Sequence, residues 1–357
     1  MARKLFIPGP IDVREDVLQK MATPMIGHRG KEASALQESI SKKLQKLLYT
    51  ENEILLSTSS GSGLMEGAIR SCTSKKAAVF SCGAFGDRWH KMAVANNVKA
   101  DLHKVDMGKA ITPELVEEVI NTGEYDLVTV QHNETSTGIT NPIEEIAEVM
   151  KKRKDIVFCV DAVSSAGGTK IEVDKLGIDI LLTSTQKALG LPPGMSMCTF
   201  SQKAIDRAET VEFRGTYLDL LDIYKYLKKK NYQYPSTPSI SHMYALDYQL
   251  DNILEEGLDN RFKRHEDMAN LVRSWAEKHF KLFTDINYLS NTLTVIENTQ
   301  NIDISKLNSQ LIKKGMQIAN GYGDLKEKTF RISHMGDYQI DDIQYLLNTI
   351  DELLDFN

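Results

Sequence analysis

A lysine and an aspartate, each following an apolar run, are the residues whose types and positions best suit a chemical reaction. Asp161 closes the run at residues 156–160, and Lys187 follows the run at residues 178–182. A lysine amine can form a Schiff base with an aldehyde, and a carboxylate can keep a pyridine nitrogen protonated so that the ring accepts electrons. If the two runs are strands of one sheet, this pair suits pyridoxal phosphate (PLP) chemistry.

A turn rich in glycine and serine offers a place for a phosphate group. Ser60-Gly61-Ser62-Gly63 follows a strand-like run and opens a helical pattern, so its backbone could approach an anion at a helix N-terminus. The same four residues would also make an ordinary strand-to-helix turn. Gly67 comes one residue too late for the dinucleotide fingerprint, and the lysine of a nucleotide P-loop is absent.

Short apolar runs alternate with amphipathic helices from about residue 53 to residue 205. Strands are expected at residues 53–57, 77–80, 127–130, 156–161, 178–183 and 195–200. Near-continuous apolar strands separated by helices indicate an α/β protein with a mostly parallel sheet that is covered on both faces. Ligands bind beyond the carboxyl ends of the strands in such sheets, which is where Phe85, Asp161 and Lys187 fall.

The length of 357 residues indicates two domains. We expect a large domain over residues 1–256, with an N-terminal arm at 1–16, and a smaller α+β domain over residues 257–357. Within the smaller domain, the segments 290–296 and 328–333 have the pattern of strands.

The composition argues against several kinds of partner. Charged residues make up 26% of the chain and the net charge is −6, which gives no electrostatic reason to expect nucleic acid or an anionic membrane. No window approaches the ~20 apolar residues of a membrane-spanning helix, and the first residues lack the apolar stretch of a signal peptide. The four cysteines are not in CxxC spacing, so we expect buried thiols, no metal site and a cytoplasmic location.

Five short motifs occur in the order seen in class V aminotransferases. They are Pro8-Gly9-Pro10, Ser60-Gly61-Ser62-Gly63, Glu134-Thr135-Ser136-Thr137-Gly138, Val160-Asp161-Ala162-Val163-Ser164-Ser165 and Ser184-Thr185-Gln186-Lys187-Ala188. Over almost its whole length the chain resembles the alanine–glyoxylate / serine–pyruvate aminotransferase branch, and the motifs are specific only when taken together. The resemblance implies fold type I of PLP-dependent transferases (aspartate aminotransferase-like), with a mostly parallel seven-stranded sheet in the large domain.

The resemblance also implies roles around the cofactor ring. Lys187 would carry the cofactor and then move a proton between Cα and C4′, while Asp161 would pair with the pyridine nitrogen. Val163 would lie under the ring. Phe85 would stack on it where this branch often has tryptophan, and Thr135 would lie near the ring hydroxyl.

The phosphate end of the cofactor is assigned in the same way. The resemblance gives it to Ser62, Gly63, Leu64 and Gln186. Leu64 stands where some relatives have histidine, so only its backbone N–H could serve. Tyr234 and Thr237 match residues that cross a dimer interface to the partner's cofactor phosphate, which implies a homodimer with composite active sites.

The substrate would be held by Arg331 and Gly9. Arg331 matches the arginine that grips the substrate carboxylate with two parallel hydrogen bonds. The branch resemblance implies an aminotransferase that moves an amino group from alanine or serine to glyoxylate or pyruvate, with ping-pong kinetics. Arg29 and Arg214 leave a second possibility open: a cation near the entrance would favour an anionic donor such as aspartate, phosphoserine or 2-aminoethylphosphonate.

Two other functions share this fold. A cysteine desulfurase or lyase usually has histidine before the lysine and a mobile catalytic cysteine, whereas here Gln186 precedes Lys187 and no cysteine lies in an evidently polar loop. A non-catalytic scaffold would not need to retain Lys187, Asp161 and Arg331 together, so an enzyme is the preferred interpretation.

Overall fold

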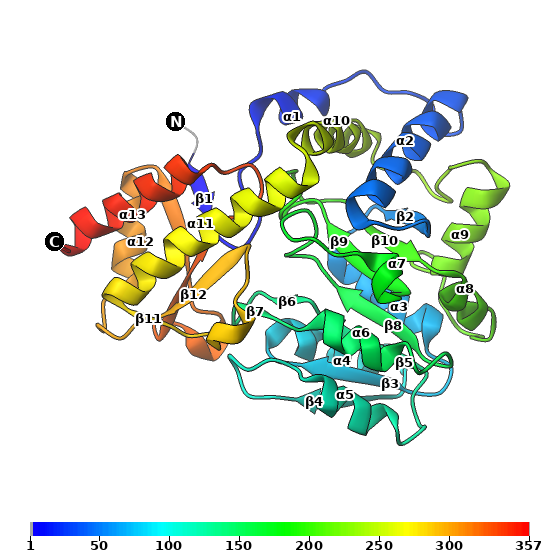
Figure 1. Ribbon diagram of the computed structural model, residues 1–357. Coiled ribbons are helices and arrows are strands. Elements are labelled where there is room, and N and C mark those ends of the chain that lie inside the picture. Colours follow the sequence, from blue (N-terminus) through cyan, green and yellow to red (C-terminus); the bar gives the residue numbers. More distant parts are fainter. Residues whose placement is uncertain (1–2, 357) are drawn as a thin grey trace.

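The computed structural model describes residues 3–356, which form two large sheets, a two-stranded hairpin and the helices that cover them (Figure 1). The larger sheet has seven strands in the order β2-β10-β9-β8-β5-β3-β4. Their bounds are β2 (Glu53–Ser57), β3 (Ala77–Ser81), β4 (Ala100–Lys104), β5 (Leu127–Gln131), β8 (Val157–Asp161), β9 (Ile180–Ser184) and β10 (Ser196–Phe200). β10 runs antiparallel to both of its neighbours, β2 and β9, and the other pairs in this sheet are parallel. The expected seven-stranded, mostly parallel sheet is therefore confirmed.

One strand of this sheet was not predicted from the sequence. β4 lies at the sheet edge, pairs only with β3, and is largely half-exposed. Its sequence, Ala-Asp-Leu-His-Lys, contains no apolar run because an edge strand buries less of its surface. The pattern that marks central strands therefore fails here.

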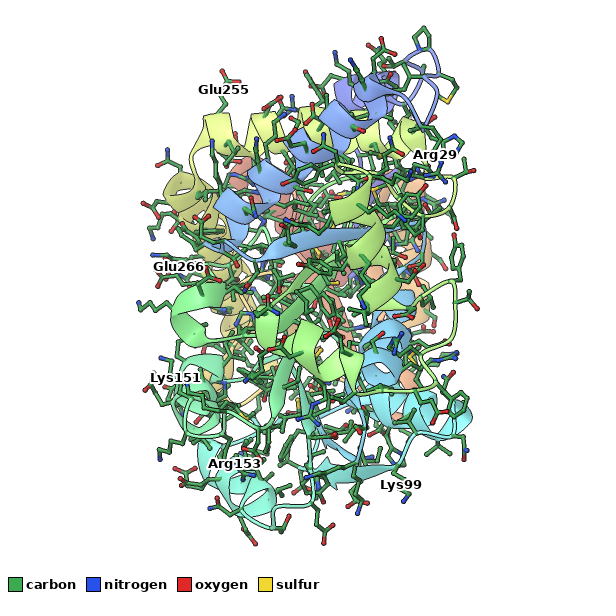
Figure 2. All side chains as sticks on the ribbon, turned by 90° about the vertical axis from the view of Figure 1, so that its right-hand side faces the viewer. Arg29, Lys99, Lys151, Arg153, Glu255 and Glu266 are labelled. Atoms are coloured by element: carbon green, nitrogen blue, oxygen red, sulfur yellow. The ribbon has the colours of Figure 1, made fainter. Side chains whose placement is uncertain are left out.

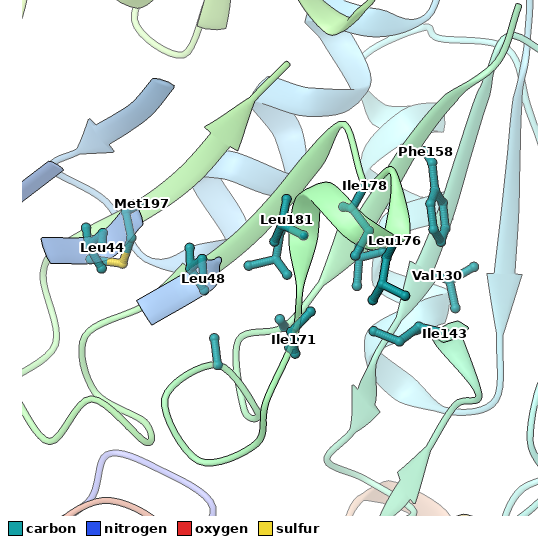
Figure 3. Close-up of a cluster of buried hydrophobic side chains, with 14 of the residues drawn as sticks. Leu44, Leu48, Val130, Ile143, Phe158, Ile171, Leu176, Ile178, Leu181 and Met197 are labelled. Carbon is teal, nitrogen blue, oxygen red and sulfur yellow. The ribbon is translucent and has the colours of Figure 1, made fainter. Parts of the chain in front are cut away.

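Each central strand contributes to two separate cores, because successive side chains point to opposite faces of a sheet. In β8, Phe158 and Val160 join one core, whereas Val157 and Cys159 join the other. Figure 3 shows part of the first core, where Leu48, Phe158 and Leu181 come from a helix and two strands. This two-sided burial is why the strands are continuous apolar runs.

Two sets of helices cover these cores. The first core is covered by α2 (Lys31–Leu48), α5 (Pro113–Ile120), α6 (Ile143–Met150), α7 (Val173–Leu176) and α10 (Ile240–Glu256). The second is covered by α3 (Gly61–Cys72), α4 (Ala84–Ala95), α8 (Gln202–Glu209) and α9 (Leu220–Lys229). The short helix α1 (Glu15–Lys20) packs against α10, and a small hairpin joins β6 (Asn133–Glu134) to β7 (Ile139–Thr140).

α5 begins at the residue that its local sequence predicts, whereas α3 begins before its first apolar residue. Pro113 is the first residue of α5 and the Thr112 side chain accepts the N–H of Leu115 at 3.3 Å, as its sequence predicts. α3 begins at Gly61, directly after Ser60, whereas the apolar residues of the helical pattern begin only at Leu64. The glycine–serine turn is itself the helix N-terminus. The apolar pattern does not reveal it, because the first turn of α3 has no apolar side chain before Leu64.

The second sheet has five strands in the order β1-β13-β14-β12-β11. Its strands are β1 (Lys4–Phe6), β11 (Lys281–Leu282), β12 (Leu293–Glu297), β13 (Met316–Asn320) and β14 (Thr329–Ser333). It is packed with α11 (Leu258–His279), α12 (Ile304–Lys313) and α13 (Ile340–Leu354), seen to the left in Figure 1. Two 3-10 turns, η1 (Ile286–Tyr288) and η2 (Gly323–Leu325), complete this part of the chain.

The N-terminal arm departs from the expected domain plan. It was expected with the large domain, but β1 pairs in parallel with β13 of the second sheet. Phe6 is fully buried in that core and stacks on Tyr338, with ring centroids 4.7 Å apart. The division between residues 1–256 and 257–357 otherwise stays a prediction.

The surface of the molecule is charged, and Figure 2 shows exposed side chains such as Lys99 and Glu255 pointing away from the ribbon. Among residues 3–356, none of the helices combines the length and apolar character needed to cross a membrane. The same part of the chain holds no group of three or more His, Cys, Asp or Glu side chains placed for a metal ion.

Candidate active site

A cavity of about 270 Å³ lies where the carboxyl ends of the large-sheet strands face the connection between β13 and β14. It is lined by Ser60, Gly61, Ser62, Met65, Phe85, Arg88, Asn133, Thr135, Asp161, Val163, Ser164, Ser184, Gln186, Lys187 and Tyr322. The structure thus brings together seven predicted site residues: Ser62, Phe85, Thr135, Asp161, Val163, Gln186 and Lys187. The register explains part of this, because Asp161 on β8 is opposite Leu182 on β9, and Lys187 follows β9 directly.

The Lys187 amine is enclosed by the N-terminal arm. It donates a hydrogen bond to the carbonyl of Pro8. Gly9 has a φ of +123°, and a Cβ added there would lie 2.7 Å from the lysine Nζ, so only glycine fits. Burial, with the positive charge of Arg331 in addition, lowers the pKa of Lys187 to about 8. A substantial fraction of this amine is therefore neutral, and nucleophilic, slightly above neutral pH.

The rate of cofactor uptake should report this lowered pKa. We expect protein stripped of PLP to take it up faster as pH rises, with a midpoint at about 8, because the neutral Lys187 amine attacks the aldehyde. An ordinary lysine would give a midpoint near its usual value of about 10.4. Stopped-flow absorbance after mixing with PLP measures the rate, and a profile without a step near pH 8 would contradict the expectation.

The Asp161 carboxylate is 5% exposed and held by two donors. The backbone N–H of Val163 donates to Oδ1 at 3.0 Å, and the indole N–H of Trp89 donates to Oδ2 at 3.3 Å. Burial raises the pKa of Asp161, while these two hydrogen bonds and the charge of Lys187 oppose the rise. A protonated pyridine nitrogen would offset the desolvation cost of this carboxylate, so the site suits the PLP ring.

Phe85 is fixed at the cavity wall by a buried carboxylate. Glu134, on the β6–β7 hairpin, accepts the backbone N–H groups of Phe85 at 3.0 Å and Gly86 at 3.1 Å at the start of α4. Burial raises the pKa of Glu134, while its hydrogen bonds, starting with those from Ser136, oppose the rise. The motif that contains Glu134 thus orients the aromatic wall of the cavity.

The opposite wall is a polar network built on the turn after β8. The Ser164 and Thr135 hydroxyls lie 2.9 Å apart, and Asn133 Nδ2 donates to Ser164 Oγ at 2.9 Å. A Cβ added at Gly61 would lie 2.7 Å from Val163 Cγ2, so the N-terminus of α3 packs directly on this turn. Val163 and the α3 N-terminus therefore meet at the cavity.

One end of the cavity carries groups suited to a phosphate. The Ser184 hydroxyl and the Gln186 Oε1 atom are buried and have no hydrogen-bond partner within residues 3–356. Arg88 donates to the Ser62 hydroxyl at 3.3 Å, beside the N-terminus of α3. A helix N-terminus, a guanidinium and the unpaired Ser184 hydroxyl favour an anion, whereas Gln186 Oε1 can only accept a hydrogen bond from a bound group.

Two residues predicted at the phosphate do not line the cavity with side chains. Leu64 is fully buried in the second core, and the N–H of Gly63 donates to the Ser60 carbonyl at 2.9 Å within the turn. A phosphate role for Gly63 and Leu64 through their backbone stays a prediction.

Arg331 lies behind the cavity wall, at 9% exposure. Its Nε donates to the carbonyl of Asn320 at 3.1 Å and its Nη1 to that of Thr135 at 3.4 Å. The guanidinium carbon is 5.5 Å from the centre of the Tyr322 ring, which does line the cavity. Burial lowers the pKa of Arg331 to about 10, so the group remains charged at neutral pH.

The two arginines considered as a second anion site are occupied elsewhere. Arg29 donates to the carbonyls of Tyr234 at 2.5 Å and Pro235 at 2.8 Å. Arg214 Nε lies 3.0 Å from both carboxylate oxygens of Asp219, the N-cap of α9. Neither arginine lines the cavity.

Tyr234 and Thr237 lie outside the cavity of their own chain. Tyr234 is only 2% exposed and packs in the second core, where burial raises its pKa to about 12. Thr237 is exposed. A contact from either residue to a partner's cofactor stays a prediction, and Tyr234 would have to leave its core position to make one.

Sequence reasoning did not assign several residues of the cavity wall. These are Met65, Arg88, Asn133, Ser164, Ser184 and Tyr322. Met65 and Arg88 follow assigned residues of α3 and α4 by three positions, so helical periodicity could have found them. Tyr322 has no comparable signal, because it belongs to a connection of the second sheet.

Comparison with known proteins identifies the family of the chain. The profile of the aminotransferase class-V family matches residues 14–346. An uncharacterized aminotransferase of Methanocaldococcus jannaschii is 42% identical over 340 residues, covering 93% of this chain and 87% of that protein. The L-aspartate–glyoxylate aminotransferase of Paracoccus denitrificans is 28% identical, covering 93% of this chain and 86% of that protein.

A solved structure is also similar over nearly the whole chain. The alanine–glyoxylate aminotransferase from Nostoc sp. superposes with a TM-score of 0.92 at 27% identity, covering 99% of this chain and 96% of that one. The cavity fits PLP through Lys187, Asp161 and the unpaired Ser184 hydroxyl beside the α3 N-terminus. This chain belongs to the class V aminotransferases and is a PLP-dependent enzyme.

Proposed function

We propose that this enzyme moves the amino group of a small neutral amino acid, alanine or serine, to glyoxylate or pyruvate by a ping-pong mechanism. The observation that carries the proposal is where the three candidate arginines lie relative to the cavity. Arg29 and Arg214 are bonded to groups away from the cavity, whereas the Arg331 guanidinium lies directly behind Tyr322, which lines it. Arg331 is therefore the one of these three arginines that could reach a substrate carboxylate. The similar enzyme from Nostoc is named for alanine and glyoxylate.

Bound PLP supplies the electron sink for the pair left by the Cα proton. Arg331 binds the donor carboxylate and so orients the Cα–H bond. Lys187, neutral in part near its pKa of about 8, accepts the Cα proton and returns it at C4′. Asp161 holds the proton on the pyridine nitrogen, and the segment around Gly9 keeps water away from the lysine amine.

The test is absorbance of the PLP-loaded protein before and after separate addition of alanine, serine, aspartate and 2-aminoethylphosphonate. Conversion of the cofactor to its amine form by alanine or serine, followed by reversal with glyoxylate or pyruvate, is the expected result. Conversion by the anionic donors alone would overturn the proposed donor class while leaving the aminotransferase chemistry in place.

Replacing Arg331 by lysine is expected to lower kcat/KM for alanine by about 10- to 100-fold, mainly through KM. A lysine keeps the charge but loses the paired hydrogen bonds to the carboxylate, and one bond to a charged group contributes about 1.5–3 kcal/mol. Steady-state kinetics measure the change, with the cofactor spectrum as a check on the site. A variant with the wild-type KM for alanine would place the carboxylate elsewhere.

Amino transfer from an anionic donor is the second candidate function, and it is favoured by the position of Arg88. Arg88 lines the cavity and also an adjoining hollow that contains Lys91. Its guanidinium lies 4.8 Å from the centre of the Phe85 ring and contacts Ser62, so the phosphate of PLP competes for the same charge. The relative from Paracoccus is named for L-aspartate, and the absorbance test separates the two donor classes.

A cysteine desulfurase is disfavoured by the thiols. Cys72, Cys82, Cys159 and Cys198 are all buried, and burial raises the pKa of each one. A desulfurase needs an accessible thiolate, which burial opposes.

A homodimer with composite active sites is part of the same proposal. Large apolar side chains are exposed on surface loops, with Met25, Phe213 and Tyr217 at 62%, 80% and 52% exposure. Exposed apolar side chains mark an interface where they form one patch, and the dimer proposed here would cover these three. Analytical ultracentrifugation at micromolar concentration should give twice the chain mass, and a monomer with full activity would refute the composite site.

A further inference from the structure

Tyr322 lies close to two residues expected at the site: Phe85, assigned to the cofactor ring, and Arg331, assigned to the substrate carboxylate. Its ring centroid is 5.8 Å from that of Phe85 on the large domain and 5.5 Å from the guanidinium carbon of Arg331. The residue is 37% exposed and lines both the active-site cavity and the adjoining outer hollow. It therefore forms the wall between the reaction site and solvent.

The segment around Tyr322 is held by its own backbone. Gly321 donates its N–H to the carbonyl of Thr329 at 2.7 Å, and a Cβ added at Gly321 would lie 2.0 Å from the Leu325 carbonyl oxygen. The Leu325 N–H donates to the Tyr322 carbonyl at 3.1 Å. Hydrogen bonds on both sides of Tyr322 favour a wall of fixed position over a freely moving loop.

The position of Tyr322 determines which part of a bound donor its ring would contact. An amino acid with its carboxylate on Arg331 and its nitrogen at the cofactor extends its side chain from a Cα between these two points. The Tyr322 ring lies within 6 Å of both Phe85 and Arg331, so it bounds the volume left for that side chain. A longer side chain would have to displace the ring.

We propose that Tyr322 determines donor size: its ring closes the side-chain end of the substrate space, and its face supports the guanidinium of Arg331. The inference rests on the proposed function, because it takes Arg331 as the carboxylate-binding group. It adds a specificity-determining residue from the second sheet to a site that is otherwise built on the large sheet.

The test compares wild-type holoenzyme with Tyr322→Ala, using Tyr322→Phe as the matched control. We expect the ratio of kcat/KM for norvaline to that for alanine to rise by about tenfold or more in Tyr322→Ala, since methylene discrimination in such a pocket is about 10- to 200-fold. Tyr322→Phe keeps the ring and should keep the wild-type ratio. An unchanged ratio in Tyr322→Ala would overturn the inference.

A binding measurement gives a second readout that needs no turnover. Calorimetry with propionate and pentanoate, which cannot react, should show pentanoate gaining affinity relative to propionate in Tyr322→Ala but not in Tyr322→Phe. Equal relative affinities in wild type and Tyr322→Ala would overturn the inference even if no neutral amino acid is a donor. If no neutral amino acid reacts but Tyr322→Ala still gains relative affinity for pentanoate, only the proposed donor class is refuted.

Discussion

Replacing Lys187 by alanine lowers kcat for amino transfer by about 10⁴-fold or more, because proton transfer by a positioned side chain alone contributes about 10²- to 10⁴-fold. Lys187 combines two tasks in one amine, since it also attaches the cofactor. Its lowered pKa of about 8 suits proton transfer near neutral pH. Steady-state rates with alanine and glyoxylate measure the loss.

A rescue experiment separates chemistry from folding. The Lys187→Ala protein should still bind PLP, and added methylamine should restore part of the rate because a free amine can replace the missing base. Lys151→Ala is the matched control, because this lysine pairs with exposed Glu148 outside the cavity lining and its loss should leave kcat unchanged. A Lys187→Ala enzyme that works at the wild-type rate would remove the lysine from the mechanism.

Replacing Arg261 by methionine is expected to destabilise the protein by roughly 3–5 kcal/mol, the cost of breaking a buried ion pair from one side. Arg261, on α11, is 1% exposed. Its Nη1 lies 2.8 Å from Glu256 and 3.1 Å from Asp337, so the variant leaves two carboxylates without this partner.

The same guanidinium connects α11 to the active-site segments. Nε donates to the Gly167 carbonyl at 2.8 Å, and Nη2 donates to the Ala188 carbonyl at 2.7 Å, next to Lys187. We therefore expect the folded variant to lose PLP faster as well. Both effects follow from one side chain that makes four contacts.

Urea unfolding of the cofactor-free protein measures the stability change. Lys152→Ala is the control, because the Lys152–Glu117 pair is exposed on both sides and such pairs contribute about 0–1 kcal/mol. Equal unfolding midpoints for Arg261→Met and Lys152→Ala would show that the Arg261 network contributes no net stability.

The sequence by itself determined the chemical centre. Lys187 and Asp161 could be assigned because each follows a short apolar run, and buried parallel strands have that local signature. The glycine–serine turn at the N-terminus of α3 was found in the same way. These features depend on residues close together in the chain, so they can be recognised without knowing what packs on them.

Charged side chains were the least predictable from the sequence. Arg29 was open as a substrate contact, but it bonds to carbonyls 205 and 206 residues away. Arg88 was not assigned at all and lines the cavity. A guanidinium can pair with any nearby oxygen, and which oxygen is near depends on the whole fold.

The tertiary structure also decided which segments reach the site from outside the large sheet. β1 pairs with β13, more than 300 residues later in the chain, and this pairing brings the Pro8-Gly9 segment over Lys187. Tyr322 reaches Phe85 from the connection between β13 and β14. Neither placement leaves a periodic trace in the sequence, because both depend on strand pairing and domain packing between residues that are distant in the chain.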